Sequence, residues 1–200
     1  MSMITDHIAK GNYKLPESTW IFNSCSATDC PSKALGLCQC PEKCYALKAE
    51  KQYPNVKPYR DRQLEITKTV SPTDFANDLI ASSKRARNPE KKMKAFRFNE
   101  SGDFADQTQL DWFTSVCKIL KAKGIKCYGY SARTDLDLRG LVGVAGVNVS
   151  NDGGDWINKG CNRFKAVDCV SGDHRVCVGD CRLCSLCVNP IGEIVEVPIH

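Results

Sequence analysis

Alternating apolar and polar positions predict three strands in the middle of the chain. In Ala95–Asn99, Phe96 and Phe98 fall on one face, which is the two-residue period of a strand. Ile125–Tyr130 is expected to form the next strand. Val142–Val149 is apolar enough to be a strand that is buried on both faces.

Helical periodicity surrounds these strands. The segment from Asp106 to Lys123 is predicted to be a helix, because its apolar residues recur on one stripe and Gly124 can end it. The stripe consists of Leu110, Phe113, Cys117 and Leu120. Three earlier helices are expected: from Cys40-Pro41-Glu42 to about Gln52, over Lys57–Lys68, and from the cap Ser71-Pro72-Thr73-Asp74 onward.

The order strand, helix, strand indicates a parallel sheet, since parallel neighbours need a crossover of about this length. A complete eight-fold barrel usually needs about 250 residues, and this chain has 200. We therefore expect an α/β fold built as an incomplete parallel (βα) barrel or an open sheet. Three regions of one domain are predicted: a cysteine-rich N-terminal segment (1–56), an α/β core (57–160) and a cysteine-rich C-terminal segment (161–200).

Small polar residues follow each predicted strand. The three segments are Asn99–Asp103, Ser131–Arg133 and Asn148–Asn151. Parallel sheets place their chemistry at the carboxyl ends of the strands, so these loops are expected to form the floor of a pocket.

Composition indicates a folded protein that stays out of the membrane. Hydrophobic residues make up 42% of the chain and charged residues 26%. Nothing near ~20 consecutive apolar residues occurs, and the start of the chain lacks the apolar core of a secretory signal. We therefore expect a cytoplasmic protein, and the net charge of +5 is mild.

Thirteen cysteines change this picture. Cytosolic reductants keep ordinary thiols apart, and an odd number cannot pair completely. Cys117 and Cys127 are predicted core residues, whereas the other 11 fall within 25–44 and 161–187. Dense cysteines in a reducing compartment favour metal ligands over disulfides.

The C-terminal set has the more informative spacing. Cys177-x3-Cys181-x2-Cys184-x2-Cys187 places four thiols in eleven residues, and Cys169 lies eight residues earlier. Repeated x2 spacings are typical of a 4Fe–4S cluster, whereas structural zinc usually takes two separated pairs. Zinc stays the alternative, and either Cys169 or Cys187 can complete the four.

The N-terminal set is looser. Cys40 and Cys44 are four residues apart at a predicted helix start, whose free amides would lower the pKa of a thiolate. With Cys30 they would supply three ligands of a second cluster and leave one iron open for a substrate or cofactor. The alternative is a closed structural site that Cys25 or Cys38 completes.

Together these motifs resemble the phage "gene product eighty-eight" family. The matching runs, in order, are Cys30-Pro31, Cys40-x3-Cys44-Tyr45-Ala46, Tyr53-Pro54-Asn55-Val56, Ser101-Gly102-Asp103-Phe104 and Cys169 with Cys177-x3-Cys181-x2-Cys184. The resemblance implies a bacteriophage protein that works in the cytoplasm of the infected bacterium.

That family in turn resembles radical S-adenosylmethionine enzymes, which hold a 4Fe–4S cluster with three cysteines near the start of a partial barrel. Their usual loop is Cys-x3-Cys-x2-Cys, but Leu47 occupies the third position here, so Cys30 would supply that ligand. The resemblance implies that Glu100-Ser101-Gly102-Asp103 receives the amino group of S-adenosylmethionine. Arg97 or Arg133 would then bind a carboxylate or phosphate.

Three functional hypotheses follow. The first is a radical or other redox enzyme acting on an unknown small molecule. The second is a non-catalytic iron–sulfur module, with one or two clusters, that binds a host or phage macromolecule. The third is a zinc-stabilised protein that binds nucleic acid, for which the cysteine spacing and the positive charge are the support.

Overall fold

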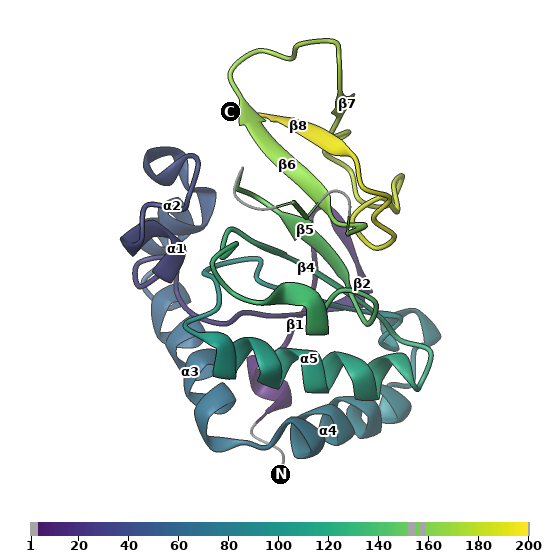
Figure 1. The fold of residues 1–200 in the computed structure, drawn as a ribbon. Helices are drawn as coiled ribbons and strands as arrows, with labels where there is room; N and C mark the ends of the chain where they lie inside the picture. Colours follow the sequence, from purple (N-terminus) through teal and green to yellow (C-terminus); the bar gives the residue numbers. More distant parts are fainter. Residues whose placement is uncertain (1–3, 152–154, 157–158, 200) are drawn as a thin grey trace.

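The computed structural model describes residues 4–151, 155–156 and 159–199. Eight strands form one sheet in the order β1-β2-β3-β4-β5-β6-β8-β7 (Figure 1). The strands are β1 (Ala9–Asn12), β2 (Leu15–Phe22), β3 (Ala95–Phe98), β4 (Lys126–Ser131), β5 (Gly146–Val149), β6 (Asn162–Val167), β7 (Arg175–Val176) and β8 (Ile194–Pro198).

The sheet is open and mostly parallel. Only the β1–β2 hairpin is antiparallel, and β1 and β7 are the two edge strands of the described sheet. The predicted mixed α/β fold is therefore confirmed, in its open-sheet form.

Helices pack mainly against one face of this sheet. They are α1 (Pro31–Ala34), α2 (Tyr45–Gln52), α3 (Val56–Thr69), α4 (Pro72–Arg85) and α5 (Gln107–Lys121), with short 3-10 turns at Thr5–His7, Pro41–Lys43, Pro89–Lys91 and Leu138–Gly140. In the described part of the chain, no helix is long and apolar enough to cross a lipid bilayer.

An aromatic core joins α4 and α5 to the sheet. Phe22 of β2 lies 4.7 Å from Phe75 of α4 and 6.0 Å from Phe113 of α5, measured between ring centroids. Phe98 of β3 adds a further contact to Phe113 at 5.9 Å. All four rings are fully buried, so this face of the sheet is covered by hydrophobic packing.

The predicted helix boundaries are close to the observed ones where side chains cap the helix. The Ser71 hydroxyl accepts the Asp74 amide hydrogen at 3.1 Å at the start of α4. Before α5, the Asp106 carboxylate accepts the Gln109 amide hydrogen at 2.9 Å. Gly124, with φ 74°, follows the end of this helix.

Two predicted elements differ from the structure. The helix expected from Cys40 begins only at Tyr45, because Pro41–Lys43 forms a 3-10 turn and the chain is extended at Cys44. The expected strand Val142–Val149 is shortened to Gly146–Val149, because residues 141–145 turn back on themselves through hydrogen bonds to Leu138 and Leu141. All four residues of β5 are buried, as predicted.

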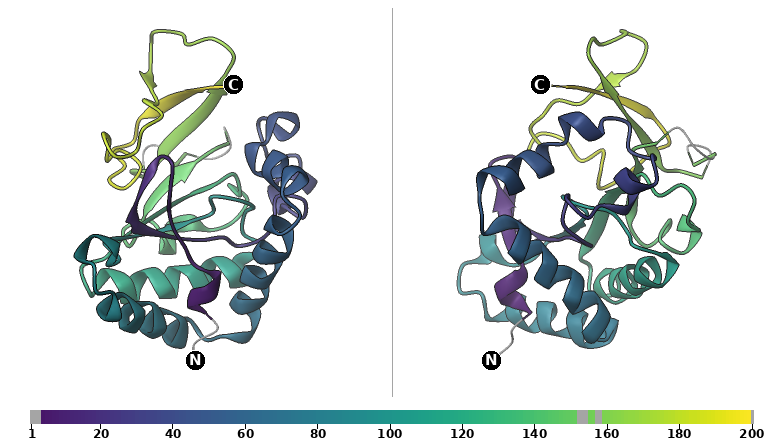
Figure 2. Two further views of the ribbon diagram at one scale, coloured as in Figure 1. Left: turned by 180° about the vertical axis from the view of Figure 1, so that it is seen from behind. Right: turned by 90° about the vertical axis from the view of Figure 1, so that its left-hand side faces the viewer.

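Residues 25–44 and the loop 177–187 lie at opposite ends of the strands (Figures 1 and 2). Residues 25–44 follow the carboxyl end of β2 and lie beside α1 and α2. The loop 177–187 lies near the amino ends of β2 and β3, where Leu15, Thr19 and Ala95 share a cavity with it.

Replacement of Phe113 by alanine should destabilise the protein by about 3–5 kcal/mol, since it leaves a cavity beside the fully buried rings of Phe22 and Phe98. The measurement is the free energy of unfolding from urea denaturation. Leu35→Ala, at a position that is 57% exposed, is the control and should change that free energy by less than about 0.5 kcal/mol. Equal effects of the two variants would contradict the packing described here.

Candidate functional site

The polar loops after β3, β4 and β5 meet at the carboxyl edge of the sheet, as the sequence predicted. Asp103 is their centre and is 4% exposed. Its two carboxylate oxygens accept five hydrogen bonds, from the Ser32 and Ser131 hydroxyls at 2.7 Å each, the Ala132 and Phe104 amides at 2.7 and 2.9 Å, and the Asn99 side chain at 3.3 Å.

This arrangement determines what Asp103 can do. Burial raises the pKa of its carboxyl group above the ordinary value, although its hydrogen-bond donors oppose the rise. Since both oxygens are occupied by protein donors, Asp103 holds the loops after β3 and β4 and the helix α1 together. A cofactor amine would have to compete with those contacts.

Gly102 and Cys25 meet just beside Asp103. Gly102 has φ 67°, and a Cβ atom there would overlap the Cys25 carbonyl oxygen, so only glycine fits at this position. The Cys25 thiol donates to the Asp103 carbonyl at 3.3 Å. Burial raises the pKa of this thiol to about 12, so Cys25 is a neutral donor within the fold.

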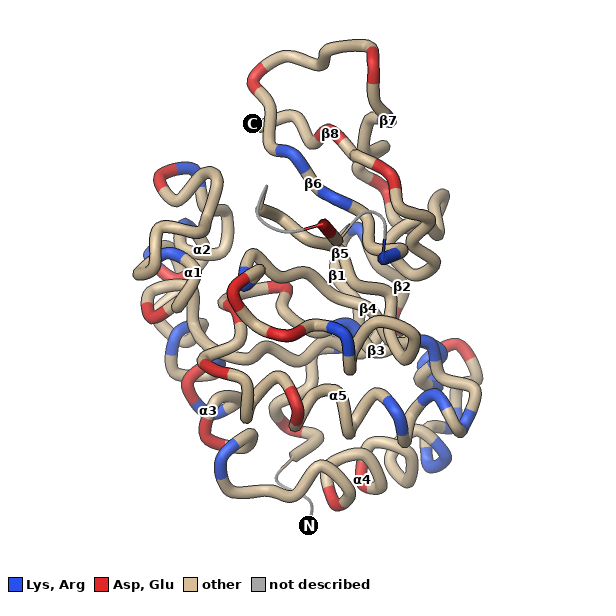
Figure 3. The backbone as a smooth tube through the Cα atoms, in the orientation of Figure 1, with Lys and Arg blue, Asp and Glu red and all other residues tan. Residues whose placement is uncertain are grey.

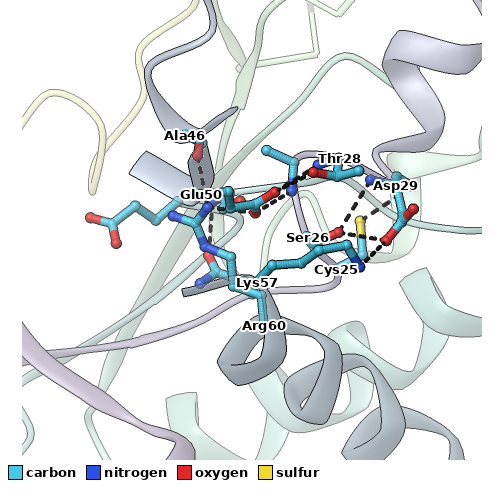
Figure 4. A network of polar contacts seen from close by, with 12 residues as sticks. Cys25, Ser26, Thr28, Asp29, Ala46, Glu50, Lys57 and Arg60 are labelled. Atoms are coloured by element: carbon cyan, nitrogen blue, oxygen red, sulfur yellow. Dashed lines mark hydrogen bonds and ion pairs between the residues drawn. The ribbon is translucent and has the colours of Figure 1, made fainter. Parts of the chain in front are cut away.

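A buried ion pair fixes the chain that follows Cys25 (Figure 4). Glu50 of α2 accepts the amide hydrogens of Ala27 and Thr28 at 2.7 and 2.9 Å and pairs with Arg60 of α3 at 2.7 Å. Burial alone would raise the pKa of Glu50, but these partners outweigh it and hold the pKa below its ordinary value. The pair thereby attaches residues 27–28 to two helices.

The remaining N-terminal cysteines lie on residues 30–44, a segment that crosses the carboxyl edge of the sheet and is called the N-terminal strap below. Cys30 precedes α1, and the Cys38 amide donates back to the Ser32 carbonyl at 3.1 Å. Farther along, the Gln39 side chain accepts the Ala166 amide hydrogen at 3.1 Å, and Lys43 pairs with Asp168 at 2.8 Å. These contacts carry the strap as far as β6.

Helix amides were expected to lower the pKa of the thiols at Cys40 and Cys44. For Cys40 the prediction is wrong, because this residue lies outside α2 and burial raises its pKa. Burial likewise raises the pKa of Cys38, and that of Cys30 to about 11. These thiols are protonated at neutral pH unless a bound cation stabilises their charged form.

The C-terminal cysteines converge on one cavity. It has a volume of about 150 Å³ and is bounded on one side by Tyr128 and Phe164. These residues lie on the face of the sheet opposite α4 and α5, which is called the inner face below. Four thiols contribute to its wall: Cys177, Cys181, Cys184 and Cys187. Cys169 is absent from that wall and is exposed, with its sulfur 3.8 Å from the Val170 carbonyl.

Cys187 is held in place by a tyrosine of β4. The Tyr130 hydroxyl donates to its sulfur at 2.9 Å. Burial raises the pKa of Cys187 to about 11, and the hydrogen bond from Tyr130 opposes this rise.

All thirteen cysteines are free thiols. Within the part of the chain that the structure describes, no group of three or more histidine, cysteine, aspartate or glutamate side chains is already arranged to hold a metal ion. A metal at either cysteine-rich segment would therefore require the sulfurs to draw together.

The other residues predicted to bind a cofactor have different surroundings. Arg133 donates to the Phe104 and Ala105 carbonyls and forms a two-point ion pair with Asp135 at 2.8 Å, so its guanidinium group is used within the fold. Arg97 lies on the inner face of β3, 3.6 Å from the Glu100 carboxylate, which also accepts the Asn12 side chain at 2.6 Å.

Ser101 differs from these residues. It is 3% exposed, and its hydroxyl makes no hydrogen bond to any part of the described chain. Of the predicted cofactor site, Arg97, Glu100 and Ser101 thus retain polar groups that the fold does not fully use.

One polar residue of the site, Ser32, escaped the sequence analysis, and it offered no local indication of its role. Its hydroxyl contacts Asp103 directly. Asn99 and Asn151 were predicted only as members of the polar loops. In the structure Asn99, which has φ 52°, donates to Asp103, and Asn151 donates to the Leu37 and Ala132 carbonyls at 2.8 and 3.2 Å.

Replacement of Asp103 by asparagine should destabilise the protein by about 2–4 kcal/mol, because an amide nitrogen would face a buried hydrogen-bond donor. Amide hydrogen exchange in residues 30–40 should accelerate at the same time. Asp111→Asn is the control, at an exposed position of α5. Unchanged stability and exchange in Asp103→Asn would refute the role of Asp103 in holding the strap.

Comparison with known proteins gives one match. The family model described as "Gene product 88" matches residues 3–145, which include β1 to β4 and the whole N-terminal strap and end just before β5. The comparisons with curated proteins and with solved structures gave no match. On the family match, the chain belongs to the phage gene product 88 family.

Proposed function

We propose that this protein is an iron–sulfur protein whose principal cluster is bound by Cys177, Cys181, Cys184 and Cys187. The observation that carries the proposal is that these four thiols line a single cavity, whereas Cys169 lies outside it. The cavity supports Cys187 as the fourth ligand, a choice that the spacing alone left open.

The surroundings of the cavity support a cluster. Its wall is largely apolar, and low solvent access is one of the factors that set the potential of an iron–sulfur centre. A bound cation would also remove the cost of charging the buried thiol of Cys187, because coordination deprotonates a thiol outright. When bound, the cluster supplies one-electron transfer.

The four sulfurs need to approach one another for this to happen. They lie on loop 177–187, which carries exposed residues such as Val178 and Leu183, so the loop is only partly packed against the sheet. Metal binding and the ordering of the ligand loop are commonly coupled in such sites.

A redox or radical enzyme is the second candidate. It is favoured by the position of the N-terminal strap, which carries Cys30, Cys40 and Cys44 across the carboxyl edge of a parallel sheet, where such sheets place their chemistry. Glu100 and Ser101 at that edge could receive the amino group of S-adenosylmethionine. Asp103 and Arg133 would serve this site by holding its loops.

The zinc and nucleic-acid hypotheses have less support. Figure 3 shows lysine and arginine interspersed with aspartate and glutamate along α3 and α4. A surface of mixed charge binds phosphates more weakly than a continuous basic stripe does.

Membership of the family supports a bacteriophage protein that works in the cytoplasm of the infected bacterium.

Anaerobic purification followed by iron, sulfide and zinc assays tests the proposal. We expect about four iron and four sulfide per bound cluster, from the composition of a 4Fe–4S centre. Cys181→Ser and Cys187→Ser should lose the C-terminal cluster, because each removes a ligand. Cys169→Ser is the matched control from the same segment and should keep the wild-type iron content.

Two results would refute the proposal. One is stoichiometric zinc in a colourless protein without sulfide. The other is a loss of iron in Cys169→Ser together with its retention in Cys187→Ser.

A further inference from the structure

A tyrosine on the inner face of the sheet contacts one of the cysteines that line the cavity. Tyr130 lies on β4, and its hydroxyl is 2.9 Å from the Cys187 sulfur. Its ring packs edge-on against Phe164 of β6, with 5.2 Å between centroids and 81° between planes. This packing fixes the direction in which the hydroxyl points.

A cation lies on the other side of the same tyrosine. The Arg97 guanidinium group is 5.2 Å from the centroid of the Tyr130 ring. Its side chain is 12% exposed, and its Nε atom has no hydrogen-bond partner among the described residues. The Glu100 carboxylate lies 3.6 Å from the guanidinium group, which is longer than a charge-assisted hydrogen bond.

The charge of Arg97 reaches the cysteines. Arg97 and Tyr130 lie on adjacent strands, the guanidinium group lies over the Tyr130 ring, and the Tyr130 hydroxyl contacts the Cys187 sulfur. A cation at this position stabilises additional negative charge on a cluster that Cys187 binds.

We propose that Tyr130 and Arg97 are positioning residues of the C-terminal cluster that raise its reduction potential, Tyr130 through its hydrogen bond to the Cys187 sulfur and Arg97 through its charge. This inference rests on the proposed function and deepens it, because the cluster would then accept electrons in addition to stabilising the fold.

The physical reason is the charge of the reduced state. Reduction adds one electron, and the sulfurs of the cluster and its ligands carry much of the added charge. A hydrogen-bond donor and a nearby cation stabilise the reduced form more than the oxidised form. The electron comes from an external one-electron reductant. No bond to the protein forms or breaks, and Tyr130 keeps its proton.

Tyr130→Phe is the central variant, because it removes the hydroxyl and keeps the ring that packs between Phe164 and Arg97. Tyr128→Phe is the matched control. Tyr128 lies on the same strand and lines the same cavity, while the hydrogen bond to the Cys187 sulfur comes from Tyr130. Arg97→Gln is a second variant that leaves that hydrogen bond in place.

The readout is an anaerobic redox titration of the full-length protein with dithionite, followed by electron paramagnetic resonance, with iron and sulfide measured on each sample. In Tyr130→Phe we expect the ratio of reduced to oxidised cluster at a fixed ambient potential to fall about tenfold, or about 59 mV for one electron. Arg97→Gln should lower the ratio as well. Tyr128→Phe should change it less than about threefold.

The two proposals fail differently. Wild-type protein without iron and sulfide would end the proposed function and this inference with it. Fully loaded Tyr130→Phe and Arg97→Gln with the wild-type potential would overturn the inference alone and leave the iron–sulfur assignment standing.

Discussion

The carboxyl edge of the sheet depends on one buried carboxylate. Asp103 accepts hydrogen bonds from the loop after β3, from the loop after β4 and from Ser32 at the start of α1. A charge this deep in the fold is costly unless donors surround it, and here five do. The same donors determine where the N-terminal strap can lie, since Ser32 follows Cys30 by two residues and its carbonyl receives the Cys38 amide.

Local pattern was sufficient for the middle of the chain. The helix α5 and the strands β3 and β4 were predicted within one or two residues, because each has a clear apolar period and α5 has a capping aspartate and a terminal glycine. The sequence analysis also placed polar loops at one edge, and Asp103, Ser131 and Ala132 do meet there. Parallel pairing alone brings such loops together, whichever residues they carry.

The two ends of the chain could not be predicted in this way. The strand β2 offers only a short apolar run at Trp20–Phe22, which periodicity cannot assign to a strand or a helix. Two-residue β7 exists only through its pairing with β8. Density of cysteine suggested a metal-binding segment at 161–200 and gave no indication that β6 and β8 extend the sheet within it.

The cysteines show why spacing and position must be considered together. Spacing could not choose between Cys169 and Cys187, because that choice depends on how β6, β7 and β8 place the intervening loop. Tertiary structure also gives Cys25 a different role from that of the strap cysteines. The Cys25 thiol is buried against Gly102 and donates to the Asp103 carbonyl. Cys25 and Cys38 were the two residues that could complete a closed N-terminal site. Of these, Cys38 is the one that does not make this contact.

A polar connection runs along the inner face of the sheet between the two cysteine-rich segments. Tyr130 contacts the Cys187 sulfur, Arg97 lies over the Tyr130 ring, and Glu100 lies 3.6 Å from Arg97. Tyr45, which follows Cys44 directly, donates to the Glu100 carbonyl. Because Arg97 lies close to both Glu100 and the Tyr130 ring, a change of charge at Glu100 or at Cys187 alters the electrostatic energy of the same guanidinium group. Residues 25–44 and the loop 177–187 are thus linked electrostatically, although they lie at opposite ends of the strands.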